Sequence, residues 1–350
     1  MNSQVSQPLP DAGAANAYDP SAEPAGLGVR TVGSDSLTGE LHDVLRLTSD
    51  LGRPAIVEML VRERATLFSR AQLPGLSDVV RVQRASSDGR VDVWSRRAEG
   101  FRLSAVLEWT EARGVASSLD AALTIGHRLL AALESLQSVD SASGASGHGA
   151  IAVDQVVVDE AGKLTLTDHA FGTALASLQW PRERLWRRFR IAMPPAAGLA
   201  RFDHRVDVTQ AAVVMCAILT GRLFKADEYP RQLEALVAEA VRRTCGGASR
   251  EERQRLTVWL RAATELEARN AFPSAAAARY ALCHAAGARL ENTDAVRRWL
   301  RDARGIPEPE PAANEVAASS AAPVAMGETP RASDPAAPLV SRLRHWISAK

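Results

Sequence analysis

The sequence has few cysteines, almost no net charge and no long apolar run. Its cysteines, Cys216, Cys245 and Cys283, show no Cys-x-x-Cys spacing, which argues against a disulfide framework or a zinc site and favours small buried thiols in a reducing compartment. The 42 basic and 41 acidic residues leave a net charge of +1, so no global attraction to nucleic acid is expected. No apolar run approaches the roughly 18 residues of a membrane helix, and the N-terminus lacks the features of a signal peptide. We therefore predict a soluble, cytoplasmic protein.

Both ends of the chain are poor in large apolar side chains. Residues 1–27 are rich in Ala, Pro, Ser and Gly, and such a segment cannot bury enough surface to offset the entropy of ordering. Residues 305–337 repeat this composition, with six prolines in an Ala/Glu/Ser stretch. We predict a disordered N-terminal tail over 1–27, a linker over 305–337, and a separate short helix over 338–350.

The intervening residues divide into a strand-rich part and a helical part. Hydrophobic residues make up 46% of the chain, which is ample for a core. Strand-like runs lie at residues 54–60, 79–83 and 90–94, with one helical stretch near 61–72. From residue 101 onward helical spacing dominates, and residues 208–219 are apolar almost all round, as in a buried helix.

A hairpin interrupts the helical part. Residues 155–158 and 163–167 are prone to form strands, and the acidic, glycine-bearing turn Asp-Glu-Ala-Gly joins them. A small sheet-rich half followed by a larger helical half predicts a bilobal α+β domain.

The segment from His148 to Asp168 resembles the catalytic loop, hairpin and metal-binding motif of bacterial Ser/Thr protein kinases. The family pattern is His-Arg-Asp, four more residues, Asn, a hairpin, and then Asp-Phe-Gly. Three further segments agree in order and spacing. Residues 53–60 resemble the N-lobe strand Val-Ala-Ile-Lys, residues 203–224 resemble the buried helix of the C-lobe, and residues 271–276 resemble a later C-lobe motif. The resemblance implies a protein-kinase-like fold with an N-lobe over 28–100 and a C-lobe over 101–304.

In this alignment, the positions that carry phosphoryl transfer in the family hold other residues. The Asp that accepts the substrate proton falls at Ala150, and the Lys that contacts the transferred phosphate falls at Ala152. The metal-binding Asn falls at Gln155. The strand Lys falls at Glu58, which would set an anion against a polyphosphate. Of the metal-binding triplet, only Asp168 remains, so we expect no catalytic residues in the family's sense.

Asp168 leaves two interpretations open. It could hold a metal ion, with Asp154 standing in for the missing Asn, or it could be a hydrogen-bonded loop aspartate. We expect no cofactor, although ATP with magnesium stays an alternative. The family's helix Glu, which pairs with the strand Lys, falls at Glu63 or, with a shift of one residue, at Arg64; Arg64 beside Glu58 would form a charge-swapped pair.

A second pair of changes suggests that the fold was kept. The family's buried ion pair of Glu and Arg falls at Pro195 and Ala271, so both partners are absent. Losing one partner of such a pair costs about 3–5 kcal/mol, whereas losing both can be nearly neutral.

Residues 180–190 lie where the family has its activation segment. Their arginines are candidates for docking an acidic or phosphorylated partner, because guanidinium groups match carboxylate and phosphate geometry. These arginines are Arg182, Arg184, Arg187, Arg188 and Arg190. The alternative is a solvated helix whose apolar side chains pack inward.

The C-terminal helix predicted over 338–350 has one apolar face, which includes Leu343 and Trp346. Such a helix could bind a partner groove, could fold back on its own domain, or, least favoured, could contact a membrane surface.

The sequence as a whole predicts a pseudokinase, that is, a scaffold or allosteric partner for other signalling proteins. One alternative is a noncanonical nucleotide-dependent transferase that uses Asp168. The other is a helical interaction module unrelated to kinases.

Overall fold

The structure is a computed structural model that describes residues 26–307, except 36–37, 70–72, 87, 144–146, 196–201 and 245–246. The predicted linker beyond residue 307, the predicted C-terminal helix with Leu343 and Trp346, and all but two residues of the predicted N-terminal tail lie outside the described residues.

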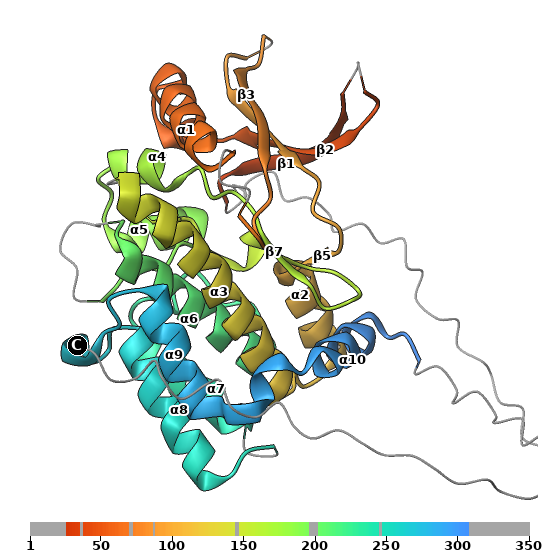
Figure 1. The fold of residues 1–350 in the computed structure, drawn as a ribbon, viewed down its shortest axis with the longest axis vertical. Coiled ribbons are helices and arrows are strands. Elements are labelled where there is room, and N and C mark those ends of the chain that lie inside the picture. Colours follow the sequence, from red (N-terminus) through yellow and green to blue (C-terminus); the bar gives the residue numbers. More distant parts are fainter. Residues whose placement is uncertain are drawn as a thin grey trace, which may run out of the picture. The chain divides into compact units, whose positions relative to one another are not determined.

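An antiparallel sheet forms the first part of the domain (Figure 1). Its strands pair in the order β1-β2-β4-β3. They are β1 (Gly28–Ser34), β2 (Leu41–Leu47), β3 (Val79–Arg84) and β4 (Val91–Arg96). The strands predicted over 79–83 and 90–94 are therefore confirmed. Gly33 lies on β1, where a Cβ atom would come within 2.7 Å of the Trp94 ring, so this glycine serves close packing across the sheet.

Helix α1 (Pro54–Ser69) corrects the strand that we predicted over residues 54–60. The run contains the adjacent β-branched residues Ile56 and Val57, which favour strands and explain the error. Val57, Val61 and Ala65 are all buried, and their spacing of four places them on one helical face. A proline is well tolerated at the first position of a helix, where its missing N–H has no partner to lose.

The second part of the domain is helical and is built around helix α6 (His204–Thr220). Its residues are buried from Val206 to Thr220, which confirms the predicted buried helix. Asp203 caps its start by accepting hydrogen bonds from the backbone N–H groups of residues 205 and 206, and Gly221 ends it in the left-handed conformation (φ 69°).

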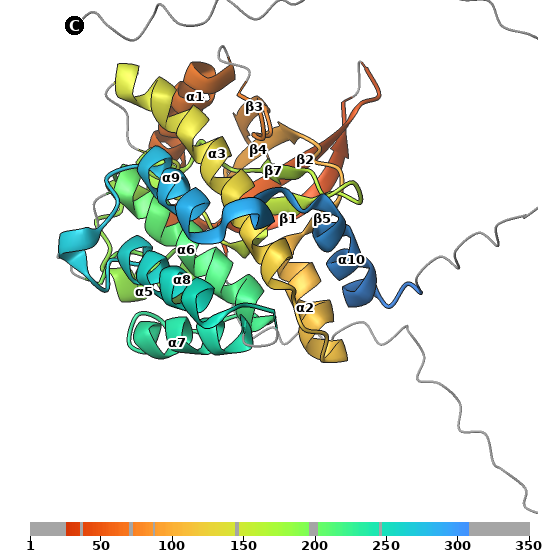
Figure 2. The same ribbon diagram turned by 60° about the horizontal axis from the view of Figure 1, so that its bottom comes forward.

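The other long helices pack against α6 or against one another. They are α2 (Leu103–Arg113), α3 (Leu119–Ser143), α7 (Leu233–Arg243), α8 (Arg250–Ala263), α9 (Ala275–Ala286) and α10 (Thr293–Arg304). Helix α3 contacts both α6 and α9, and α10 lies beside α2 in both views (Figures 1 and 2). Within the described residues, no helix is long and apolar enough to cross a membrane.

The predicted hairpin is present between the two parts. Strands β6 (Val156–Val158) and β7 (Leu164–Leu166) pair antiparallel, and the short strand β5 (Phe101–Arg102) pairs with β6. Gly162 closes the turn at φ 80° and donates its N–H to the carbonyl of Asp159 (2.9 Å). Only glycine adopts this conformation without steric cost.

Two hydrophobic cores hold the domain together. The first lies among the helices around α6. The second combines the inner face of the sheet and α1 with helix α4 (Gly172–Ser177) and helix α5 (Arg182–Phe189). Figure 1 shows α4 next to α1, in agreement with the contacts between the two helices. Phe171, Leu175 and Leu185 are fully buried in this second core, so apolar packing joins the two parts directly.

Candidate functional site between the sheet and the helices

The loop over residues 147–151 is held by two side chains of α6. The carboxylate of Asp207 accepts hydrogen bonds from the backbone N–H groups of His148 (2.9 Å) and Gly149 (2.8 Å). The Gln210 amide accepts from the N–H of Ile151 (2.8 Å) and donates to the carbonyl of Gly149 (3.1 Å). Both α6 side chains are fully buried, so they fix the loop against a rigid helix.

Small apolar side chains occupy this loop at the positions where the resembling family has its catalytic Asp and Lys. Ala150 is fully buried and belongs to the second core, and Ala152 is 6% exposed. Neither methyl group can accept a proton or contact a phosphate by charge. Gln155, which ends the short turn Val153–Gln155, is buried and donates its amide to Asp168 (Nε2 to Oδ2, 3.2 Å).

Asp168 lies just after β7 and is almost completely buried, with 3% of its surface exposed. Its φ of 65° is left-handed, which is uncommon for a residue other than glycine. The guanidinium of Arg30, on strand β1, donates to both carboxylate oxygens of Asp168. Burial alone would raise the pKa of the Asp168 carboxyl, but the charge and hydrogen bonds of Arg30, the charge of Arg102 and the Gln155 amide hold it below its usual value.

Arg102 extends this charged network. Its guanidinium donates to the carbonyl of Asp154 (2.5 Å) and to the carboxylate of Asp43 on β2 (3.5 Å). Burial and the neighbouring charge of Arg30 lower the pKa of Arg102. The space between β1, β2 and the hairpin therefore holds two arginines surrounded by aspartates, and their charges largely compensate one another.

This arrangement does not fit a magnesium–nucleotide complex at Asp168. Both carboxylate oxygens already accept hydrogen bonds, and a divalent cation there would have to displace Arg30. In the described part of the chain, no group of three or more His, Cys, Asp or Glu side chains could hold a metal ion. A hydrogen-bonded loop aspartate, the second of our two interpretations, agrees with these contacts.

Glu58 does not occupy the position that we predicted for it. It lies on α1 rather than on a strand, so the alignment of residues 53–60 with the family's lysine-bearing strand fails. Its carboxylate pairs with Arg62 (2.6 Å) and Arg84 (2.8 Å). Arg64, the other predicted partner, instead donates to the carbonyl of Gly147 (2.8 Å) and so ties α1 to the start of the loop.

Two buried histidines lie close to Asp168: His169 follows it directly in sequence, and His148 lies in the loop beside it. The N–H of Ala150 donates to Nδ1 of His148 (3.2 Å), so Nε2 of this ring is protonated and donates to the Thr167 carbonyl (3.1 Å). The ring of His169 packs edge-on against Phe68, with centroids 5.2 Å apart. Burial lowers the pKa of His148 to about 3 and that of His169 to about 4, so both rings are neutral in the folded protein near pH 7.

We expect the stability of the protein to fall in mild acid because of these histidines. Below pH 6.5, the ordinary pKa of histidine, both residues are protonated in the unfolded chain but stay neutral in the native state. The free energy of unfolding therefore decreases as the pH falls toward the lower pKa values of the folded protein. The two rings together predict a loss of about 2.5 kcal/mol between about pH 7 and about pH 5.5. Urea unfolding at a series of pH values measures this loss.

Two variants that each replace one histidine serve as controls for this experiment. His169→Leu should remove about half of the pH dependence, whereas His284→Gln, at an exposed position, should leave it unchanged. Equal slopes in all three proteins would show that the buried rings are not the cause. Asp168 does not contribute in this window, because its pKa lies below the ordinary value of 3.8.

The predicted basic segment forms helix α5, and its apolar side chains pack inward. Leu185, Trp186 and Phe189 are buried, as the solvated-helix interpretation requires. Trp180 stacks in parallel on Phe189, with centroids 5.5 Å apart, and Arg184 lies over the outer face of Trp180 (3.7 Å to the centroid).

The five arginines of this segment have different environments. Arg184 and Arg187 are exposed, and Arg182 pairs with its neighbour Glu183. The Arg188 guanidinium forms an ion pair with Asp50, which lies in the turn after β2. The backbone of Arg190 adopts the left-handed conformation (φ 59°), and its side chain lines a cavity between α2, α5 and α6. The structure therefore leaves two of these arginines, rather than five, on the surface.

Sequence reasoning missed Arg30 and Arg102. Arg30 lies 138 residues from Asp168, and nothing in the run Gly-Val-Arg-Thr-Val distinguishes it from an ordinary solvent-facing strand residue. Arg102 stands at the junction of β5 and α2, a position that becomes visible only once the hairpin is known to pair with β5.

Comparison with solved structures identifies the fold. The chain is similar to the crystal structure of the Mycobacterium tuberculosis PknI kinase domain carrying a single-residue mutation, with a TM-score of 0.52 and 15% identity over 76% of this chain and 93% of that chain. A second structure of the PknI kinase domain gives a TM-score of 0.51 and 14% identity over the same shares. No family model and no curated protein matches the sequence. At this identity the similarity establishes the fold alone, and the chain has a protein-kinase-like fold.

Proposed function

We propose that this protein is a pseudokinase, a kinase-like domain that does not transfer phosphate and acts in the cytoplasm by binding other signalling proteins as a scaffold or allosteric partner. The observation that carries the proposal is the buried ion pair between Arg30 and Asp168. In the kinase fold, the aspartate that follows the hairpin is the one that binds the metal ion. Here that carboxylate is neutralised by a side chain of the protein itself.

The surrounding residues support the same conclusion. Phosphoryl transfer depends on positioned charges, which include a base for the attacking hydroxyl and cations for the phosphates. Ala150 and Ala152 supply neither, and Gln155 directs its amide toward Asp168 rather than offering an oxygen to a metal ion. The aspartates Asp43 and Asp154 add negative charge close to the place where polyphosphate would lie.

The surface of α5 is the contact region that we propose for a partner. Arg184 and Arg187 are exposed there, and Arg184 is held flat against Trp180. A guanidinium that is already ordered loses less entropy when it binds a carboxylate or phosphate group. The predicted C-terminal helix with Leu343 and Trp346 is a second proposed contact, and a membrane surface is the least favoured target for it.

Thermal unfolding with and without nucleotide tests the proposal. We expect ATP with magnesium or manganese to leave the melting temperature unchanged, because a ligand raises stability only if it binds the native state. A radiolabelled assay with ATP and a generic protein substrate should likewise show no transfer above the level of a no-enzyme blank.

Asp168→Ala is the matched variant for this test. Saturable stabilisation of the wild-type protein by nucleotide that disappears in Asp168→Ala would contradict the proposal that the protein does not use nucleotide. The alternative hypothesis, a noncanonical transferase that uses Asp168, would then explain the data better. Stabilisation that persists in Asp168→Ala would instead indicate a nucleotide-binding pseudokinase that does not use this carboxylate.

A further inference from the structure

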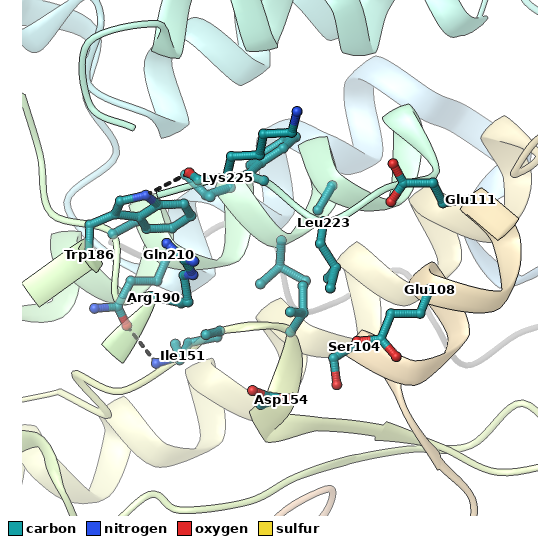
Figure 3. Close-up of a pocket in the computed structure, with 17 residues that line it drawn as sticks. Ser104, Glu108, Glu111, Ile151, Asp154, Trp186, Arg190, Gln210, Leu223 and Lys225 are labelled. Atoms are coloured by element: carbon teal, nitrogen blue, oxygen red, sulfur yellow. Dashed lines mark hydrogen bonds between the residues drawn. The ribbon is translucent and has the colours of Figure 1, made fainter. Parts of the chain in front are cut away.

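A cavity of about 490 Å³ lies against the loop over residues 151–154 and shares Asp154 with the charged network around Asp168. Helix α2, the end of α5, helix α6 and the segment 223–225 form its walls (Figure 3). Its volume falls in the range of roughly 300–1,000 Å³ that is typical of small-molecule sites. Neither Arg30 nor Asp168 lines it, so its occupancy can be studied separately from nucleotide binding.

The cavity has a cationic side, which Arg190 provides. Nη1 of Arg190 is buried and has no hydrogen-bond partner among the described residues. The backbone of Arg190 is left-handed, and its guanidinium lies near the ring of Trp186 (5.6 Å to the centroid). Burial lowers the pKa of this arginine, as expected for a cation without a counter-ion. A buried, unpartnered donor in a strained backbone position is unfavourable for the empty protein.

The opposite side of the cavity is acidic. Glu108 and Glu111, one turn apart on α2, and Asp154 of the loop line it. Burial, and after it the neighbouring charge of Asp154, raise the pKa of Glu108. Figure 3 shows Glu108, Ser104 and Asp154 on one side of the cavity and Arg190, Trp186 and Gln210 on the other.

The floor between the two charged sides is apolar and well ordered. Val213, Val214 and Ala217 of α6 form it, together with Ile151 of the loop. The loop position is fixed because Gln210 accepts a hydrogen bond from the backbone of Ile151, and the Trp186 indole donates to the carbonyl of Lys225 (3.1 Å). Across the cavity, the guanidinium of Arg190 is thus followed by an apolar strip and then by the carboxylates of Glu108 and Asp154.

We propose that this cavity binds a zwitterionic small molecule, with an anionic group at Arg190, an ammonium group at Glu108 and Asp154, and an aliphatic chain along the α6 floor. The ligand needs both charges. Its anionic group would pair with the unpartnered guanidinium of Arg190, and its ammonium group would offset the repulsion between the carboxylates of Glu108 and Asp154. Molecules that carry only one of the two charges leave the opposite side uncompensated and bind more weakly.

A series of ω-amino acids tests this proposal on the full-length protein. Isothermal titration calorimetry with γ-aminobutyrate, ε-aminocaproate and their longer homologues should reveal one chain length that binds best. Caproate and hexylamine, each with one charge of ε-aminocaproate, should bind at least about tenfold more weakly than the best zwitterion, because each lacks one charge-assisted contact.

Two variants locate the site. Arg190→Gln and Glu108→Gln should each weaken binding of the best zwitterion about tenfold, whereas Arg187→Gln, an exposed arginine on the same helix, should not change it. Glu108 is exposed on α2, so its replacement tests the acidic side even if Arg190→Gln folds poorly. The proposal is overturned if no zwitterion of the series binds, if the single-charge molecules bind equally well, or if Glu108→Gln binds like the wild type.

Discussion

Replacing Arg30 with glutamine is expected to destabilise the native protein by about 3–5 kcal/mol, because it leaves the Asp168 carboxylate buried without its cation. The neutral glutamine could still donate one hydrogen bond, but it cannot balance a charge that is 3% exposed. Urea unfolding near pH 7, where the Asp168 carboxyl is ionised, measures the loss.

The controls separate this ion pair from ordinary surface charges. Arg255→Gln removes one partner of an exposed pair on α8, and it should cost no more than about 1 kcal/mol. The double variant Arg30→Gln/Asp168→Asn removes both charges, so it should recover much of the stability that Arg30→Gln alone has lost. A loss below about 1 kcal/mol in Arg30→Gln would mean that Asp168 is not buried against Arg30 in solution.

Replacing Phe171 with alanine is expected to have a comparable effect, a loss of about 3–5 kcal/mol, by leaving a cavity at the junction of the two parts. The ring is fully buried in the second core, which the sheet, α1, α4 and α5 share. Because the packing is shared, the backbone amides of β2 and those of α4 should lose protection together in hydrogen exchange.

Val258→Ala is the control for this second prediction, since Val258 is 54% exposed on α8 and its truncation should change stability by no more than about 0.5 kcal/mol. Loss of protection confined to α4 in Phe171→Ala, with the sheet amides unchanged, would contradict the idea that one core supports both parts.

The fold could be predicted largely because its decisive segments carry local signals. The hairpin over β6 and β7 is marked by β-branched residues around an acidic turn that ends in Gly162, and α6 is marked by an unbroken apolar run. The second half of helix α1 was predicted, but its first part over residues 54–60 was taken for a strand because Ile56 and Val57 favour strands and because the run imitates a family motif. The periodicity of Val57, Val61 and Ala65 was the better signal, since it reflects which face is buried.

The candidate site was predictable only in part. Asp168 was found because it follows the hairpin, a relation that is local in sequence. Its partner Arg30 could not be found, because the pair depends on how the sheet lies on the hairpin, and pairing across 138 residues leaves no trace in local composition. The cavity at Arg190 could not be predicted for the same reason, since its lining residues come from five separate segments of the chain.

The shared second core also has a consequence for synthesis on the ribosome. Strand β1 and helix α1 are translated well before α4 and α5, whose side chains complete their core. Until those later residues emerge, the inner face of the sheet stays exposed to solvent, and exposed apolar surface of this kind is prone to aggregation. We therefore expect the nascent N-terminal half to be the stage at which the chain is most prone to aggregate.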